Sequence, residues 1–190
     1  MAMHMDQLGR RGNPWRMAVW GAAACLLLLP LVAMQFTRDV NWTGSDFALF
    51  GTMLLVACGM YELGAWISGN TAYRAGMGLA VAGGFFLVWV HMAVGVLGND
   101  TNRENLMFAG VLAVGIIGAL VARFRPAGMA RAAGATAIAQ ALACIVAVLL
   151  FAADHEKGPI AILSAILVLA WSVSAVLFRL AARQETARAQ

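Results

Sequence analysis

The feature that most constrains this chain is a series of six apolar stretches, each long enough to cross a membrane. A helix needs roughly 20 mostly apolar residues to span the hydrocarbon core of a bilayer. The hydrophobic fraction is 62%, so a soluble globule of this composition would leave large apolar patches in water. We therefore predict an all-α polytopic membrane protein, a bundle of six transmembrane helices over residues 17–36, 47–67, 75–97, 106–122, 132–153 and 159–180.

The segments outside the six stretches are too short to fold as domains. We expect a tail over residues 1–16, a transmembrane domain over 17–180 and a second tail over 181–190. The first stretch follows a basic segment, as a signal peptide would, but its apolar run continues beyond Cys25, the residue of a faint cleavage box. We interpret this stretch as a retained first helix.

Basic residues are distributed unevenly between the two sides that six spans define. Ten of the 13 fall on the side of both termini, and Arg38, Arg103 and Lys157 fall on the other. Because Lys and Arg are retained on the cytoplasmic side, both termini are predicted to be cytoplasmic. A basic face beside anionic lipid headgroups also accounts for the net charge of +4 without nucleic acid. The residues that carry the orientation include Arg10, Arg11, Arg16, Arg74, Arg123, Arg125, Arg131 and Arg179.

Two ionisable residues, Glu62 and His91, lie within the predicted spans, where such groups are functional candidates by default. Glu62 lies about 7.5 Å from the cytoplasmic end of its helix, so we expect it to reach the headgroup zone or to pair with Arg74 or Arg123, with a proton or cation site as the alternative. His91 is interpreted as a hydrogen-bonded packing residue, with a haem or quinone contact as the alternative. Gln140, near mid-depth, is the long polar side chain that would accompany Glu62 along a membrane path.

Acidic residues and one histidine gather on the predicted outer side. Carboxylate and imidazole groups are possible cation ligands, but this set lacks the spacing of a metal-binding motif. We therefore predict no metal and no cofactor, with a cation site as the alternative. The residues concerned are Asp100, Glu104, Asp154, His155 and Glu156.

Small residues recur at four-residue spacing in several of the apolar stretches. Such faces let helix backbones approach closely in lipid, either within one chain or between chains. The recurring sets are Gly64 with Ser68, Gly115 with Ala119, and Ala133 with Ala137 and Ala141.

Part of the chain resembles a known family. Residues 93–108, from Ala93 to Phe108, together with 115–126 and 128–131, resemble a family of small uncharacterised proteobacterial inner-membrane proteins. The resemblance covers mainly the third to fifth apolar stretches and implies a bacterial inner membrane. It implies no activity, because none is assigned to the family.

Three classes of function remain open from the sequence. The sequence contains no Walker motif, GxSxG, HExxH or dinucleotide fingerprint, so we expect a protein that is not an enzyme. The first class is a structural or accessory component of a membrane complex. The second is a small oligomeric transporter or channel that uses Glu62 and Gln140. The third is a membrane redox or cofactor-binding protein that uses His91. The expected partners are the lipid bilayer and either further copies of the chain or a larger membrane complex.

Overall fold

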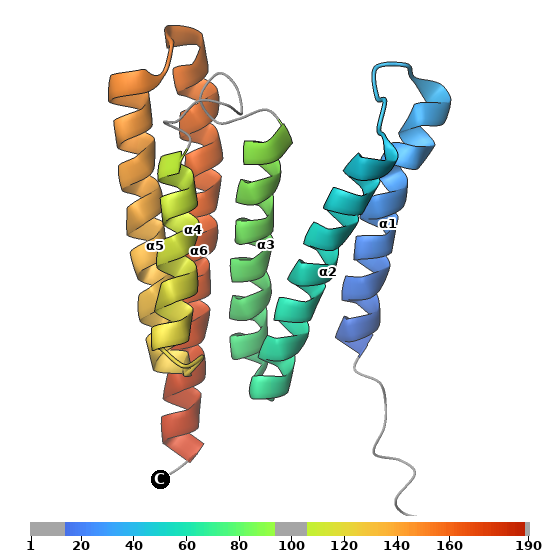
Figure 1. Ribbon diagram of the computed structural model, residues 1–190. Helices are drawn as coiled ribbons and strands as arrows, with labels where there is room; N and C mark the ends of the chain where they lie inside the picture. The colour runs from blue at the N-terminus through green and yellow to red at the C-terminus, as the bar shows by residue number, and fades with distance from the viewer. Residues whose placement is uncertain (1–13, 94–105, 189–190) are drawn as a thin grey trace, which may run out of the picture. The chain divides into compact units, whose positions relative to one another are not determined.

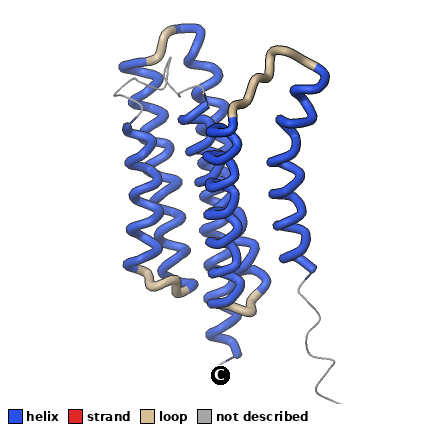
Figure 2. Tube along the Cα trace, turned by 45° about the vertical axis from the view of Figure 1, so that its right-hand side comes forward, coloured by secondary structure: helices blue, strands red, loops and turns tan. Residues whose placement is uncertain are grey.

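The computed structural model describes residues 14–93 and 106–188, and every regular element within these ranges is a helix (Figure 1). Figure 2 shows the same trace as helices joined by short loops. The prediction of an all-α chain is confirmed. The elements are α1 (Pro14–Phe36), α2 (Gly44–Ile67), α3 (Thr71–Ala93), α4 (Leu106–Val121), α5 (Pro126–Val146), the short π-helical segment η2 (Ala147–Phe151) and α6 (Asp154–Arg188).

Five of the described helical segments are long and apolar enough to cross a membrane. They are α1, α2, α3, α5 together with η2, and α6, which confirms that several predicted stretches are helices of spanning length. Helix α4 is apolar but has only 16 residues. At 1.5 Å per residue the described part of this helix is about 24 Å long, against a hydrocarbon core of about 30 Å.

The helix boundaries differ from the predicted ones at several ends. Helix α4 ends at Val121, one residue before the predicted end at residue 122. Helix α5 begins at Pro126, before the predicted start at residue 132. Helix α6 begins at Asp154 and continues to Arg188, through most of the segment predicted as a tail.

Side-chain caps fix the starts of three helices. Before α2, the backbone N–H and the hydroxyl of Thr43 both donate to Asp46 Oδ2 at 2.7 Å. Before α3, Asn70 Oδ1 accepts hydrogen bonds from two backbone N–H groups of the first turn. Before α6, the N–H of Ala153 donates to Glu156 Oε2 at 3.0 Å. These contacts satisfy N–H groups that a helix cannot satisfy itself, so each loop ends at a defined residue.

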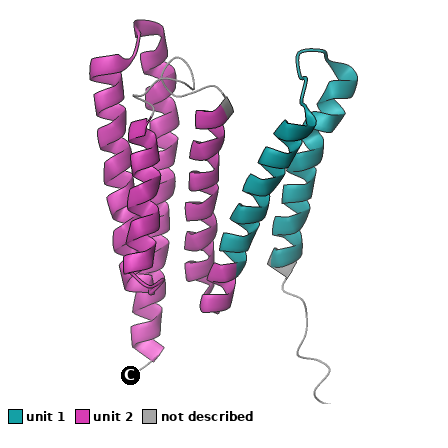
Figure 3. Ribbon diagram, viewed as in Figure 1, with its two compact units in different colours: residues 1–62 teal, residues 63–190 magenta. Residues whose placement is uncertain are grey.

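The chain divides into two compact units between Glu62 and Leu63 (Figure 3). Unit 1 is a hairpin of α1 and most of α2. Its loop is held by Trp42, whose ring packs edge-on against Phe47 and Phe50 with centroids 5.2 and 5.4 Å away. Most large apolar side chains of α1 are exposed, which suits a helix surrounded by lipid.

Unit 2 is a four-helix arrangement in which α6 packs against α5 and α3, and α5 packs against α4. Its buried side chains form two clusters. One is centred on Leu87, Phe108, Leu167 and Trp171, and the other on Tyr73, Met77, Met129 and Phe178.

Helices α4 and α5 approach each other closely because small residues face one another along the hairpin. A Cβ atom added at Gly118 would lie 2.8 Å from the Cβ of Ala132, and one added at Gly128 would lie 2.6 Å from the Cβ of Ala122. Both distances are shorter than van der Waals contact allows. The glycines therefore set the separation of the two backbones, as small residues do between helices in lipid.

The predicted small-residue sets are partly used in this packing. Ala133 and Ala137 are buried, and Gly115 faces Thr136, so these residues pack within the chain. On α4 the close contact with α5 is made by Gly115 and Gly118, whereas Ala119 packs beside the cluster around Tyr73. Within unit 2, Gly64 lies directly against the side chain of Met77.

The turn between α4 and α5 places two residues other than glycine in the left-handed region. Arg123 has φ 48° and Phe124 has φ 57°. The N–H of Phe124 donates to Ala119 O at 3.2 Å and that of Arg123 to Leu120 O at 3.0 Å, which is a Schellman closure with arginine where glycine is usual. The hydroxyl of Tyr73 donates to Phe124 O at 2.7 Å and holds this turn against the start of α3.

Two glycine substitutions on α4 test the close approach. Gly118→Ala should lower the stability of the purified protein by about 1–3 kcal/mol, because the added methyl group meets the backbone-proximal atoms of Ala132. Gly110→Ala is the matched control, since nothing lies within 4 Å of its added Cβ. Thermal unfolding in detergent should show a lower midpoint for the first variant only. Equal midpoints would contradict the packing described for α4 and α5.

Candidate functional site

The acidic residue predicted within a span, Glu62, forms an ion pair in unit 1. Arg16 Nε donates to Glu62 Oε1 at 2.7 Å, and Trp20 Nε1 donates to the same oxygen at 3.2 Å. Arg16 and Trp20 are four residues apart, so they lie on one face of α1. The carboxylate therefore faces a cation and an indole donor from a single helix face.

The position of this pair explains how a carboxylate is tolerated near a membrane. Arg16 lies in the first turn of α1, and Glu62 lies about 7.5 Å before the end of α2. The side chain of Arg16 is 59% exposed and that of Glu62 is 22% exposed. An ionised group is costly in lipid unless it is paired or reaches the interface, and this carboxylate is paired. Sequence analysis expected an arginine partner but named Arg74 or Arg123, whereas Arg16 is the partner within unit 1.

Gln140 is fully buried in unit 2, at the contact between α5 and α6. Its Nε2 donates to Ser164 Oγ at 3.3 Å. Both side chains are at most 1% exposed. The bond joins two helices that also pack through apolar side chains, so Gln140 acts as an interhelical tie in the interior of unit 2.

Other polar side chains of unit 2 also tie separate helices together. Ser174 of α6 donates to Gly76 O of α3 at 2.8 Å. Asn70 Nδ2, at the start of α3, donates to Gln184 Oε1 near the end of α6 at 2.9 Å. The bond from Tyr73 adds a tie to the α4–α5 turn, and α3, α5 and α6 each take part in at least one such contact.

Three buried side-chain atoms in the described residues have no hydrogen-bond partner there: Gln140 Oε1, Trp171 Nε1 and His91 Nδ1. Trp171 packs its ring against Gly83, where an added Cβ would lie 3.3 Å from the ring. This close packing fills the space beside the indole with carbon atoms. The three atoms mark the places where unit 2 offers an unused donor or acceptor.

His91 is partly buried near the end of α3 as the structure describes it. The predicted hydrogen bond is not made by its Nδ1 within the described residues. In the same part of the chain no group of three or more His, Cys, Asp or Glu side chains is placed to hold a metal ion. Within the described residues, Nδ1 of His91 is thus buried without a partner, and both the packing role and the haem or quinone contact stay predictions.

Comparisons with protein-family models, with curated proteins and with solved structures find no match to this chain. The geometry of the described residues therefore carries the functional argument.

The arginines predicted to set the orientation lie in several different elements of the fold. Arg10 and Arg11 lie outside the described residues. Arg74 lies in the first turn of α3, and Arg179 lies in the last third of α6. Arg123 and Arg125 lie on the α4–α5 turn, and Arg131 lies on the second turn of α5.

The acidic residues of the predicted outer side have structural roles where they are described. Asp154 pairs with Lys157 at 2.7 Å, and Glu156 caps the start of α6. Negative charge is favourable in the first turn of a helix. Asp100 and Glu104 lie outside the described residues.

Three residues that make these contacts, Trp20, Ser164 and Ser174, were not predicted from the sequence. Trp20 stands four residues after Arg16, a spacing that places both on one helix face and was readable from the sequence. Ser164 and Ser174 carried no comparable signal, because serine in an apolar helix often bonds only to its own backbone. Their roles depend on which helices become neighbours.

A double-mutant cycle tests the ion pair of unit 1. Glu62→Gln should lower the free energy of unfolding only slightly, because the amide keeps the shape of the side chain and still accepts hydrogen bonds. Arg16→Gln should lower the free energy of unfolding more, because the carboxylate loses its cation. Combining both changes should recover part of the lost free energy. We expect a coupling energy of about 1 kcal/mol from unfolding in detergent.

Arg38→Gln is the control for this cycle, since Arg38 lies in the α1–α2 loop at the opposite end of the hairpin. It should leave stability unchanged. Additive effects of Arg16→Gln and Glu62→Gln would show that the two side chains do not interact.

Proposed function

We propose that this protein is a non-enzymatic, structural or accessory component of a membrane complex. The supporting observation is that polar side chains in its apolar helices are engaged in contacts between helices: Glu62 with Arg16, Gln140 with Ser164, and Ser174 with Gly76 O. In lipid, such contacts stabilise helix association. Groups committed in this way are less available to a substrate or a translocated ion.

The proposal includes six transmembrane helices, with α4 as the fourth. Contacts along the whole of α4 support this. Near one end, Phe108 and Val111 belong to the same buried cluster as Ala147, the first residue of η2, which continues α5. At the other end, Gly128 and Ala122 meet beside the turn. Helix α4 therefore lies along the length of a helix that is itself long enough to span.

The proposal also places both termini in the cytoplasm. Within unit 2, the start of α3, the α4–α5 turn and the C-terminal part of α6 lie at one end (Figure 1). That end carries Arg74, Arg123, Arg125 and Arg179, among others, whereas Lys157 lies with two acids in the α5–α6 region. Basic residues at one end are typical of a cytoplasmic face.

A bacterial inner membrane is the location we propose, because residues 93–108, 115–126 and 128–131 resemble small proteobacterial inner-membrane proteins. The basic end of unit 2 agrees with anionic lipid on the cytoplasmic leaflet. The partners we propose are the bilayer and a larger membrane complex.

A small transporter or channel is the second candidate, because Gln140 presents an unpaired Oε1 in the interior of unit 2. A transported polar group would make use of this acceptor. The buried contact of Gln140 with Ser164 favours the structural role over this one.

Complementation of a deletion strain separates the two candidates. Glu62→Gln and Gln140→Met should both rescue the strain's growth or membrane-integrity defect as well as the parent chain does, because each variant keeps the packing. Normal size-exclusion profiles would show that both variants fold, and Gly118→Leu is the matched change that should break the packing. Variants that fold normally but fail to rescue would contradict the structural role and favour transport.

A further inference from the structure

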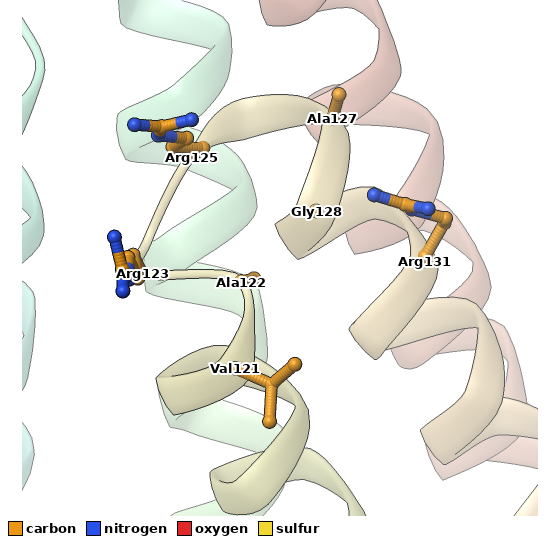
Figure 4. Close-up of a pocket in the computed structure, with 7 residues that line it drawn as sticks. All are labelled: Val121, Ala122, Arg123, Arg125, Ala127, Gly128 and Arg131. Carbon is orange, nitrogen blue, oxygen red and sulfur yellow. The ribbon is translucent and has the colours of Figure 1, made fainter.

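Three arginines line one open hollow at the α4–α5 turn. The hollow has a volume of about 460 Å³. Figure 4 shows Arg123 and Arg125 on the turn itself and Arg131 on α5, on the far side of Gly128. The remaining lining residues are apolar or glycine, so the hollow contains three positive charges and no acidic side chain.

The three guanidinium groups are not neutralised by the rest of the described chain. All three arginines are exposed, and neither of the two ion pairs found among the described residues involves them. None of their side chains makes a hydrogen bond that the structure shows within residues 14–93 and 106–188. Like charges gathered around one hollow repel each other, so a bound anion would relieve this repulsion.

The backbone of the turn is strained at one of these arginines, Arg123. Arg123 occupies the left-handed position where glycine would be unstrained. The turn would therefore form at least as well without the arginine side chain. Strain at a residue other than glycine is typical of a site where the side chain has a role beyond folding.

We propose that this arginine hollow binds a phosphate group. Guanidinium groups pair with phosphate oxygens through two parallel hydrogen bonds, and the three that line this hollow give it the positive charge that such an anion requires. Lipid headgroups and free phosphate share this chemistry. The place of the hollow, at the end of two apolar helices, brings it to the level of lipid headgroups and favours an anionic phospholipid.

This inference rests on the membrane placement proposed above, but its test does not depend on which face is cytoplasmic. Purified full-length protein in a neutral detergent is titrated with phosphatidylglycerol, and bound lipid is counted by native mass spectrometry. The triple variant R123Q/R125Q/R131Q should bind the lipid at least tenfold more weakly than the parent. Inorganic phosphate is tested separately by its effect on the melting temperature.

The matched control removes three arginines from a different segment. The variant R179Q/R183Q/R188Q loses the same charge from α6, outside the hollow. It should keep the lipid affinity within about threefold of the parent value, since a diffuse surface charge contributes weakly and is screened by salt. Equal weakening by both triple variants, or no weakening by the first, would overturn the proposal.

Two further readouts identify the source of the phosphate and exclude misfolding. Inorganic phosphate at millimolar concentration that stabilises the parent but not the triple variant would assign free phosphate, and lipid binding without such stabilisation would assign the headgroup. Arg123→Gly should keep or raise the melting temperature while weakening lipid binding. A variant that lowers stability and leaves binding unchanged would show that Arg123 serves the turn alone and would overturn its place in the site.

Discussion

The absence of water inside a bilayer is the constraint on which this structure depends. Backbone groups of a span must be satisfied by the helix itself, and polar side chains must find partners in the chain or at the interface. Glu62 meets this constraint through Arg16 and Trp20, and Gln140 meets part of it through Ser164. The polar residues within the apolar helices therefore specify which helix faces meet.

Small residues complete this specification in unit 2. Gly118 and Gly128 bring α4 and α5 closer than any side chain would allow, and the hairpin then presents its arginines together at one turn. The same close packing gives α4 a spanning neighbour along its length, although α4 itself is short. The close packing of α4 and α5 thus forms the basic hollow that we describe at their turn.

Much of the helical content was predictable from the sequence, because a run of about 20 apolar residues is itself the signal. The caps formed by Asp46 and Glu156 also follow from short-range spacing. The partner of Glu62 was not predictable, since Arg16 lies 46 residues away in the chain. The hollow could not be predicted either. The excess of basic residues on one side accounts for Arg123, Arg125 and Arg131 one by one, but it does not indicate that they line a common hollow.

Cysteine accessibility at Arg125 tests the central claim, six spans with α4 among them, most directly. In a chain whose Cys25, Cys58 and Cys144 are replaced, Arg125→Cys and Lys157→Cys are each treated with a membrane-impermeant thiol reagent in intact cells. Six spans with cytoplasmic termini predict labelling at position 157 and protection at position 125, with labelling at 125 only after the cells are opened. If α4 did not cross the membrane, the two positions would exchange sides, and labelling of position 125 from outside would contradict the account.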